Sequence, residues 1–268
     1  MGVATVPSGA LDHLVINTRF GTDEAQALFE GLGFTLTPRG HHSLGSINHL
    51  ALFNGGYLEL IGLPQGTDRL RQEILDSPVG IDGLVAATRE AQACHDAWTA
   101  QGLRVQPVQQ FSRPVEYGGR EQLARFSTAR LEPGQLPAGR VYACQHHTPE
   151  LVWQPQWLQH ANGVQGISAL VVVSAQPEQA RSAYARLHAW GPEFTIECTD
   201  AAGWAARFGA LADHAPARSE FFGAIQFHGA DLADQAARAQ RLGLPVQPAR
   251  ERLMVALPAL HALLEFVP

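Results

Sequence analysis

The chain has 268 residues, of which 46% are hydrophobic and 16% charged, so it can bury a large core in one or two domains. Its formal net charge of −6 argues against a nucleic-acid-binding protein, which normally carries a basic stripe. The longest aliphatic run, Ala169 to Val173, is far too short for a membrane span, and residues 1–10 lack the features of a secretory signal, so we expect a cytoplasmic protein.

The three cysteines, Cys94, Cys144 and Cys198, are scattered and show no CxxC spacing. This usage fits a reducing compartment, and free cysteines are commonly small buried residues. We therefore expect them to be core residues and not metal ligands. The chain also lacks the GxGxxG, GxxxxGK, GxSxG and HExxH motifs, so nucleotide binding, serine hydrolysis and zinc-protease chemistry receive no support.

The stretch from Leu11 to Gly62 predicts a strand, a helix, a hairpin and a closing strand. With a period of two, His13 lies on one face of the opening strand and Glu59 on one face of the closing strand. A helix from Asp23 to Leu32, stopped by Gly33, must bury its apolar stripe against the fully apolar faces. His13 and Glu59 are therefore predicted to share the helix-free face of one sheet, where a metal or an acid–base pair can act.

A second unit repeats this order. Its opening strand is predicted at Gly80 to Ala87, with Gly83 at the position of the first unit's histidine. A helix, a loop that contains Arg113 and a closing strand follow, and in that strand Glu150 takes the position of the first unit's glutamate. The expected bounds of these elements are Arg89 to Gln101, Phe111 to Gly119 and Val141 to Trp153.

Two further units begin near residues 166 and 222. The third has a strand and a helix from Pro177 to Trp190, and then a compressed remainder that includes Glu197. The fourth is more complete and closes on a strand with Glu265. We expect Glu197 and Glu265 to be structural, because neither unit has a matching histidine. Repetition at this scale indicates units that cannot close a cavity alone, so paired units would form two incomplete barrels.

The order of a strand with a central histidine, a helix, a hairpin and Tyr-Leu-Glu-Leu resembles a module of the vicinal-oxygen-chelate superfamily, which includes the glyoxalases. The segments Thr37 to Asn48, Gly56 to Leu60 and Gln145 to Trp153 are similar to its branch of glyoxalase-like domain proteins. The resemblance implies an α+β fold of four βαβββ modules, paired into two incomplete mixed-sheet barrels with helices outside. We expect an N-terminal domain at 1–153, with modules at 11–62 and 80–153, a linker at 154–163 and a degenerate C-terminal domain at 164–268.

In that superfamily a paired-module cavity holds one divalent metal ion, with ligands from the middle of each opening and closing strand. Position by position, the resemblance implies His13, Glu59 and Glu150 as ligands and leaves the place of Gly83 without one. His147 can supply the fourth ligand, although its neighbour His146 fits equally well and the sequence does not choose between them. A site with only three protein ligands, or with no metal, also remains open. The set of imidazole and carboxylate groups suits Mn, Fe, Ni, Co or Zn.

Five further residues lie in or beside polar loops near the expected mouth of the first cavity: His42, Asn48, Arg113, His160 and Asn162. Side chains of these types orient a substrate carbonyl, carboxylate or hydroxyl group. His41 or His49 can replace His42 in this role, and the whole segment can equally be a surface turn. Arg39 and Arg113 are also candidates to neutralise Glu59 and Glu150.

We therefore expect a cytoplasmic, glyoxalase-like, metal-dependent lyase or isomerase that acts on a small, oxygen-rich substrate. The metal ion would bind vicinal oxygens of that substrate, and Glu59 and Glu150 would be catalytic. An extradiol-type dioxygenase is one alternative, and a metal-free protein that binds or sequesters a small molecule is another. We expect a small-molecule substrate and allow for a homodimer, and we expect neither nucleic acid nor a membrane as partner.

Overall fold

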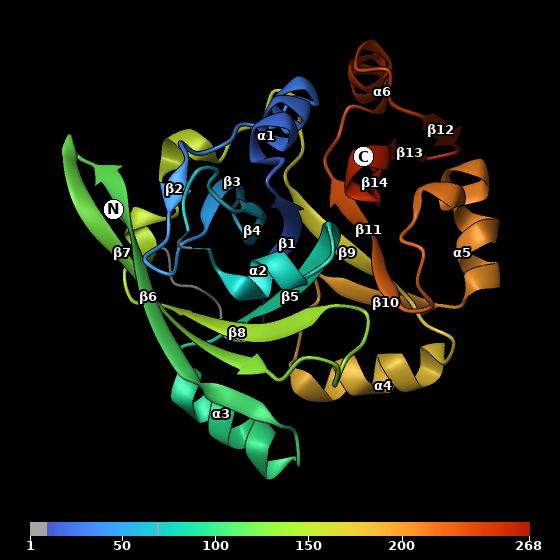
Figure 1. The fold of residues 1–268 in the computed structure, drawn as a ribbon. Helices are drawn as coiled ribbons and strands as arrows, with labels where there is room; N and C mark the ends of the chain where they lie inside the picture. The colour runs from blue at the N-terminus through green and yellow to red at the C-terminus, as the bar shows by residue number, and fades with distance from the viewer. Residues whose placement is uncertain (1–9, 69) are drawn as a thin grey trace.

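A computed structural model describes residues 10–68 and 70–268 (Figure 1). It contains two mixed β-sheets with helices outside them, which confirms the α+β fold and the pairing of modules into two incomplete barrels. None of the helices in the described ranges is long and apolar enough to cross a membrane.

The first sheet has eight strands in the order β2-β3-β4-β1-β5-β8-β7-β6, so the opening strands of both modules, β1 and β5, are adjacent at its centre. Each opening strand runs parallel to the closing strand of its own module, β1 to β4 and β5 to β8. The strands are β1 Leu11–Arg19, β2 Gly40–His41, β3 Ile47–Phe53, β4 Gly56–Gly62, β5 Gly80–Ala87, β6 Val105–Tyr117, β7 Arg120–Leu131 and β8 Arg140–His146. The helices are α1 Thr22–Gly31, α2 Gln72–Asp76 and α3 Ala91–Ala100, and two 3₁₀ turns follow, η1 Pro149–Leu151 and η2 Pro155–Trp157.

The second sheet has six strands in the order β10-β9-β11-β14-β13-β12. Its strands are β9 Gly166–Val173, β10 Thr195–Thr199, β11 Phe221–His228, β12 Val246–Ala249, β13 Arg252–Leu257 and β14 Ala262–Phe266. Its helices are α4 Pro177–Leu187, α5 Ala201–Phe208 and α6 Leu232–Arg241, with 3₁₀ turns η3 Gly209–His214 and η4 Pro258–Leu260. In the third module α5 and η3 follow β10 where the other modules continue with strands, so this module is compressed as expected.

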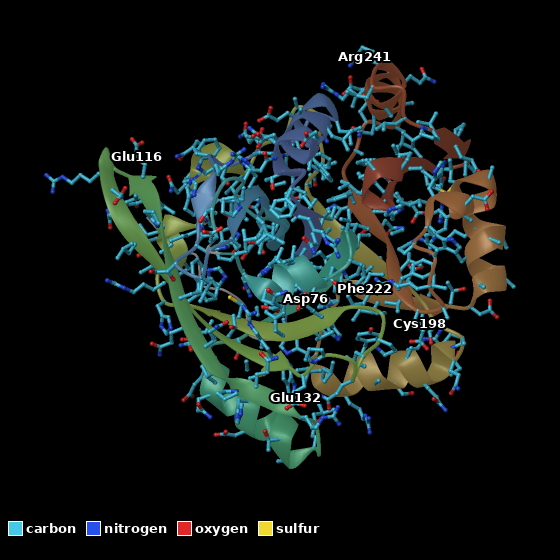
Figure 2. The ribbon with its side chains drawn as sticks, viewed as in Figure 1. Asp76, Glu116, Glu132, Cys198, Phe222 and Arg241 are labelled. Atoms are coloured by element: carbon cyan, nitrogen blue, oxygen red, sulfur yellow. The ribbon has the colours of Figure 1, made fainter. Side chains whose placement is uncertain are left out.

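The two sheets share one apolar core between them. Leu14 and Leu84 from the first sheet and Leu170 and Phe222 from the second belong to the same buried cluster. Figure 2 shows Phe222 where the two halves of the molecule meet. The opposite faces of the sheets are concave, and each has its own smaller core. The shared core therefore covers one face of each sheet. The opposite face of each sheet remains separate, and we call this face the cup of that sheet.

The central β1–β5 pair contains two symmetrically placed irregularities. Its register slips by one residue at Asp12 in β1 and again at Asp82 in β5, which are equivalent positions in the two modules. Such β-bulges place an extra residue on one strand and change the direction of its side chain. Both aspartates are almost fully buried. The first bulge brings the Asp12 carboxylate beside the imidazole of His13, its chain neighbour.

Two predicted boundaries in the second module are wrong. The strand β6 passes through Arg113 and pairs with β7 up to the turn at Gly118 and Gly119, whose positive φ angles suit a tight hairpin. Figure 2 shows Glu116 at the outer tip of this hairpin. The closing strand β8 ends at His146, because the chain turns into η1 at Pro149, which cannot donate a backbone hydrogen bond to a sheet.

Gly83 is required by the tight packing at the centre of the first sheet. A Cβ atom there would lie 2.7 Å from Cβ and Cγ2 of Val15, its partner on β1. We expect Gly83→Ala to lower the free energy of unfolding by about 1–3 kcal/mol, as overpacking commonly does. Gly55→Ala is the control, because its added Cβ would meet no atom closer than 3.8 Å; we expect a change below about 0.5 kcal/mol. Urea denaturation measures both, and equal effects would contradict the packing argument.

Candidate active site in the first sheet

The cup of the first sheet contains a narrow cavity lined by both polar and apolar side chains. It provides about 20 Å³ for the centre of a water-sized molecule, which is room for about one water. Strands β1, β3, β4, β6 and β8 all contribute side chains to it. Its polar lining includes His13, His42, Asn48, Glu59, Arg113 and Tyr142.

Glu59 lies at the centre of this cavity and is only 5% exposed. Its Oε1 accepts a hydrogen bond of 2.7 Å from the amide of Asn48, and its Oε2 lies 3.7 Å from Nε2 of His13. Burial acts to raise the pKa of Glu59, but the imidazoles of His13 and His42 and the Asn48 amide outweigh burial and lower it. Glu59 is therefore an anionic carboxylate, and its Oε2, which accepts no hydrogen bond from the described residues, is directed toward His13.

The orientation of His13 is fixed by its neighbours. Nδ1 lies 2.5 Å from the carboxylate of Asp12, and the ring stacks on Tyr57 with centroids 4.3 Å apart. Burial acts to raise the pKa of Asp12, but His146 and His13 outweigh burial and lower the pKa to about 2. An ionised Asp12 requires a proton on Nδ1 of His13, so Nε2 is directed at the cavity. There the hydroxyl of Tyr142 is 3.4 Å away.

The polar contacts continue to His42 on the other side of Glu59. Nδ1 of His42 lies 2.9 Å from the Ser46 hydroxyl, and the Asn48 amide lies 3.3 Å from Nε2. Burial, with help from the nearby cation Arg113 and against the attraction of Glu59, lowers the pKa of His42 to about 3. His42 is therefore a neutral imidazole. A continuous line of polar contacts thus runs across the cup from His146 through Asp12, His13, Glu59 and Asn48 to His42.

Arg113 is a buried cation without an acidic partner. Only 5% of the residue is exposed, and none of the ion pairs in the described part of the chain includes it. Burial lowers the pKa of its guanidinium group, and Tyr57 and Glu59 oppose this effect. Arg113 packs against Gly40, where a Cβ would lie 3.2 Å from its Cδ. A charged group buried in this way favours an anionic ligand.

The structure brings five of the predicted site residues into this cavity: His13, Glu59, His42, Asn48 and Arg113. Of the three candidate histidines His41, His42 and His49, the structure places only His42 in this cavity. His41 is exposed on β2, and the buried His49 faces away and bonds with its Nδ1 to the carbonyl of Thr37.

Glu150 and His147 lie outside the cavity. Glu150 is exposed on η1, beyond the end of β8, so its predicted register with Glu59 is wrong. His147 is exposed and contacts the Ser127 hydroxyl at 2.8 Å. His146, the alternative that the sequence left open, is the histidine that turns inward, because it is the last residue of β8 and keeps the face of the sheet that lines the cup.

His160 and Asn162 also lie outside the cavity, on the helix side of the sheet. The His160 ring bonds to the backbone of Thr35 and Leu52, and the Asn162 side chain bonds to the backbone of Leu32 and Val164. Both residues therefore fix the connection after η2 to the first module and do not reach the cup.

Sequence reasoning missed Asp12 and Tyr142. The Asp12 side chain points into the cup only because of the bulge in β1, and no sequence pattern predicted this bulge. Tyr142 is the residue at the position of Glu59: Val15 pairs with Glu59 in the first module, and its equivalent Val85 pairs with Tyr142 in the second. If the closing strand had been predicted to end at His146, Tyr142 would have been aligned with Glu59. The second module therefore contributes a glycine and a tyrosine where the first contributes a histidine and a glutamate.

The cup of the second sheet is closed by its own side chains. Trp204 and Phe208 from α5 fill its apolar part. Glu265 is fully buried and paired with Arg207 and Arg252, and Gln226 donates a hydrogen bond to it. These partners neutralise Glu265, which supports a structural role for this half.

The profile of the family described as "Glyoxalase-like domain" matches residues 11–188, which is more than half of the chain. The chain belongs to the glyoxalase-like domain family. A search of curated protein sequences returned no match.

Solved structures with the same fold support the wider superfamily assignment of this glyoxalase-like protein. One is a hypothetical protein from Staphylococcus aureus, with a TM-score of 0.67 and 11% identity, covering 97% of this chain and 99% of that one. A second is a xylose isomerase-like TIM barrel/4-hydroxyphenylpyruvate dioxygenase fusion protein, with a TM-score of 0.57, 12% identity and coverage of 98% and 49%. A third is a mutant of 4-hydroxymandelate synthase from Streptomyces coelicolor, with a TM-score of 0.53, 11% identity and coverage of 97% and 92%. Together with the family match, they confirm membership of the vicinal-oxygen-chelate superfamily.

His13 and Glu59 fit the divalent metal that this superfamily implies. Nε2 of His13 and Oε2 of Glu59 are two electron-pair donors 3.7 Å apart, a separation that two ligands of one ion can have. Asp12 holds the other nitrogen of His13, as carboxylates do behind metal-bound histidines. These two side chains would supply two ligands, which would leave coordination positions for substrate and water.

Glu73 holds three arginines at the edge of the cavity: Arg71, Arg130 and Arg140, at 2.6, 2.6 and 3.0 Å. Burial acts to raise the pKa of Glu73, but these cations outweigh burial and hold it well below the ordinary value of 4.5. The ion pairs of Glu73 therefore stabilise the folded state fully above pH 4.5. This contribution to the free energy of unfolding is lost as the pH falls through the lower pKa that Glu73 has in the folded state.

We expect Glu73→Gln to lower the free energy of unfolding at pH 7 by about 1–3 kcal/mol, as losing a hydrogen-bonded charge does. The difference from wild type should shrink below pH 4.5, as measured by urea denaturation at several pH values. Glu132→Gln, which removes an exposed ion pair with Arg104, should cost less than about 1 kcal/mol. A Glu73 effect that does not change with pH would contradict the assignment.

Proposed function

We propose that this glyoxalase-like protein is a metal-dependent enzyme of the lyase or isomerase type, acting on a small anionic substrate with vicinal oxygens. The observation that carries the proposal is the pair of His13 Nε2 and Glu59 Oε2, 3.7 Å apart in a buried cavity. The same cavity holds the guanidinium of Arg113, which forms no ion pair with any residue in the described ranges. These two potential electron-pair donors face each other in the cavity, an arrangement that a bound cation would stabilise.

The residues around the pair would have separate roles. A bound divalent ion supplies Lewis-acid stabilisation of negative charge on substrate oxygens. Asp12 keeps Nε2 of His13 directed at the cavity, and Asn48 holds Oε1 of Glu59, so that Oε2 can accept a proton from the substrate and return it. The Tyr142 hydroxyl, which stays protonated because burial raises its pKa, can donate a hydrogen bond to a substrate oxygen.

The arrangement of cavities indicates how a substrate would enter. A larger cavity of about 510 Å³ lies outside the first one, and Arg113 and Val152 line both. The inner space admits only about one water molecule, so a substrate must displace side chains of the inner wall. Phe111 of β6, which is half-buried and packs edge-on against His42, is suited to move. We propose that Arg113 binds the carboxylate of the substrate on its way into the cup.

The metal site is tested by binding of Mn²⁺, Fe²⁺ and Ni²⁺ to metal-free protein, measured by equilibrium dialysis. At least one of these ions should bind, and His13→Gln or Glu59→Gln should weaken binding by more than about 100-fold, since losing even an outer partner of a ligand costs about 10–100-fold. Glu150→Gln is the matched control, because its carboxylate is exposed, and should bind like wild type. Failure of wild type to bind any of the ions, or unchanged binding in both variants, would refute the metal site.

The anionic substrate is tested with two small chelators of the same carbon skeleton, lactate and propane-1,2-diol. We expect Arg113→Met to weaken binding of lactate to the metal-loaded protein by about 10–100-fold in calorimetry, the value of one charged hydrogen-bonded contact. Binding of the neutral diol should not change. Arg125→Met, an exposed position on the same hairpin, should affect neither ligand. Equal losses for both chelators would show that Arg113 only shapes the cavity.

A second candidate function is a metal-free protein that binds a small molecule, and the second module favours it. Gly83 and Tyr142 occupy two of the positions from which the superfamily takes its metal ligands. In this case a proton on Nε2 of His13 would supply the positive charge beside Glu59. Native mass spectrometry separates the two: an organic ligand that copurifies without metal favours the binding protein.

Dioxygenation is the other reaction class to be compared with lyase or isomerase chemistry, because one structural neighbour is described as a dioxygenase fusion protein. Oxygen consumption during turnover would distinguish it. We also propose that the protein works in the reducing cytoplasm, which the three free cysteines support.

A further inference from the structure

A second group of ligating side chains lies in the same cup, behind His13 as seen from Glu59. It consists of Asp12, Cys144 and His146, and one ligand atom from each lies within 4.8 Å of the other two. In the described ranges it is the only group of three or more histidine, cysteine or acidic side chains this close together.

The fold explains how these residues meet. Cys144 and His146 are two residues apart on β8, so both side chains lie on the face that lines the cup. β8 pairs with β5 and β5 with β1, and the bulge of β1 directs the Asp12 carboxylate toward the same place. Both oxygens of Asp12 lie 3.1 Å from Nε2 of His146.

The group contains buried polar atoms without partners. Asp12 is 1% exposed, and although its Oδ1 bonds to His13, its Oδ2 accepts no hydrogen bond of acceptable geometry. Nδ1 of His146 also has no hydrogen-bond partner in the part of the chain that the structure describes. The rings of Tyr57, Phe126 and Trp153 surround the His146 imidazole, so the environment is otherwise apolar. Buried unpartnered groups are destabilising and usually have a specific explanation, such as a bound ion.

We propose that Asp12, Cys144 and His146 form a second metal site, selective for a borderline-soft divalent ion such as Zn²⁺ or Co²⁺. The donors are a carboxylate, a thiolate and an imidazole, a set that suits tetrahedral zinc with one further position open. Binding forms a metal–sulfur bond and releases the thiol proton of Cys144 to solvent, so the two negative charges of thiolate and carboxylate balance the ion. Until then the thiol keeps its proton, because burial raises its pKa.

Occupancy of this site would also affect His13. Asp12 would contact the ion through one oxygen and His13 through the other, so the ion would withdraw electron density from the carboxylate that orients the imidazole. The site does not depend on the proposed function, since neither His13 nor Glu59 is among its three ligands. The proposed second site differs from the expectation that all three cysteines are only core residues. In this proposal Cys144 is a metal ligand, while Cys94 and Cys198 are not.

The test is a titration of the metal-free full chain with Co²⁺, followed by absorbance. We expect a thiolate-to-cobalt charge-transfer band in the near ultraviolet that saturates at about one equivalent, as a single three-ligand site requires. Cys144→Ser should abolish the band, while Cys94→Ser and Cys198→Ser should retain it. His146→Gln should weaken Co²⁺ binding by at least about 10-fold.

A double variant, His13→Gln with Glu59→Gln, separates the two metal sites: it should keep the charge-transfer band even though it loses the site of the proposed enzyme. Absence of the band in wild type would overturn the second site, and so would a band that persists in Cys144→Ser. Circular dichroism confirms the fold of each variant. If Cys144→Ser does not fold, the wild-type titration and His146→Gln still decide the question.

Discussion

The burial of the Glu59 carboxylate is the constraint on which the site depends. An ionised carboxylate is costly to bury unless donors or positive charges compensate it, and here the compensation comes from several strands at once. Asn48 of β3 donates to one oxygen, and His13 of β1 lies beside the other. These partners hold their positions only while the strand order and register of the first sheet are kept. The site is therefore a property of the whole sheet and not of a local motif.

The two cups show how one fold can serve two purposes. In the second sheet, Glu265 is at the position corresponding to the closing-strand glutamate, but two arginines neutralise it and α5 fills the surrounding space. In the first sheet, the nearby arginines Arg71 and Arg130 are bound by Glu73, so Glu59 remains available to the cavity. The placement of the neighbouring cations, and not the local sequence, thus decides whether the closing-strand carboxylate is neutralised or remains available to the cavity.

The paired bulges at Asp12 and Asp82 give a similar comparison within the first sheet. Equivalent positions of the two modules bury an aspartate, but Asp12 contacts His13 and His146 while Asp82 is paired with Arg140. The histidine pair lowers the pKa of Asp12, whereas burial, opposed by Arg140, raises that of Asp82. The bulge itself is architectural, and its partners decide whether it takes part in a site.

The sequence alone determined the repeated modules and the faces of His13 and Glu59, because alternation along a strand and apolar stripes along a helix are local properties. It also showed Gly83 as a departure from the ligand pattern. It did not determine the end of β8, the path of β6 through Arg113 or the bulge at Asp12, because these follow from pairing between distant strands. Because β8 ends a few residues earlier than predicted, Glu150 lies outside the cup, and Tyr142 and His146 lie in it. Only the tertiary structure, which fixes register through long-range hydrogen bonds and packing, could decide which side chains meet there.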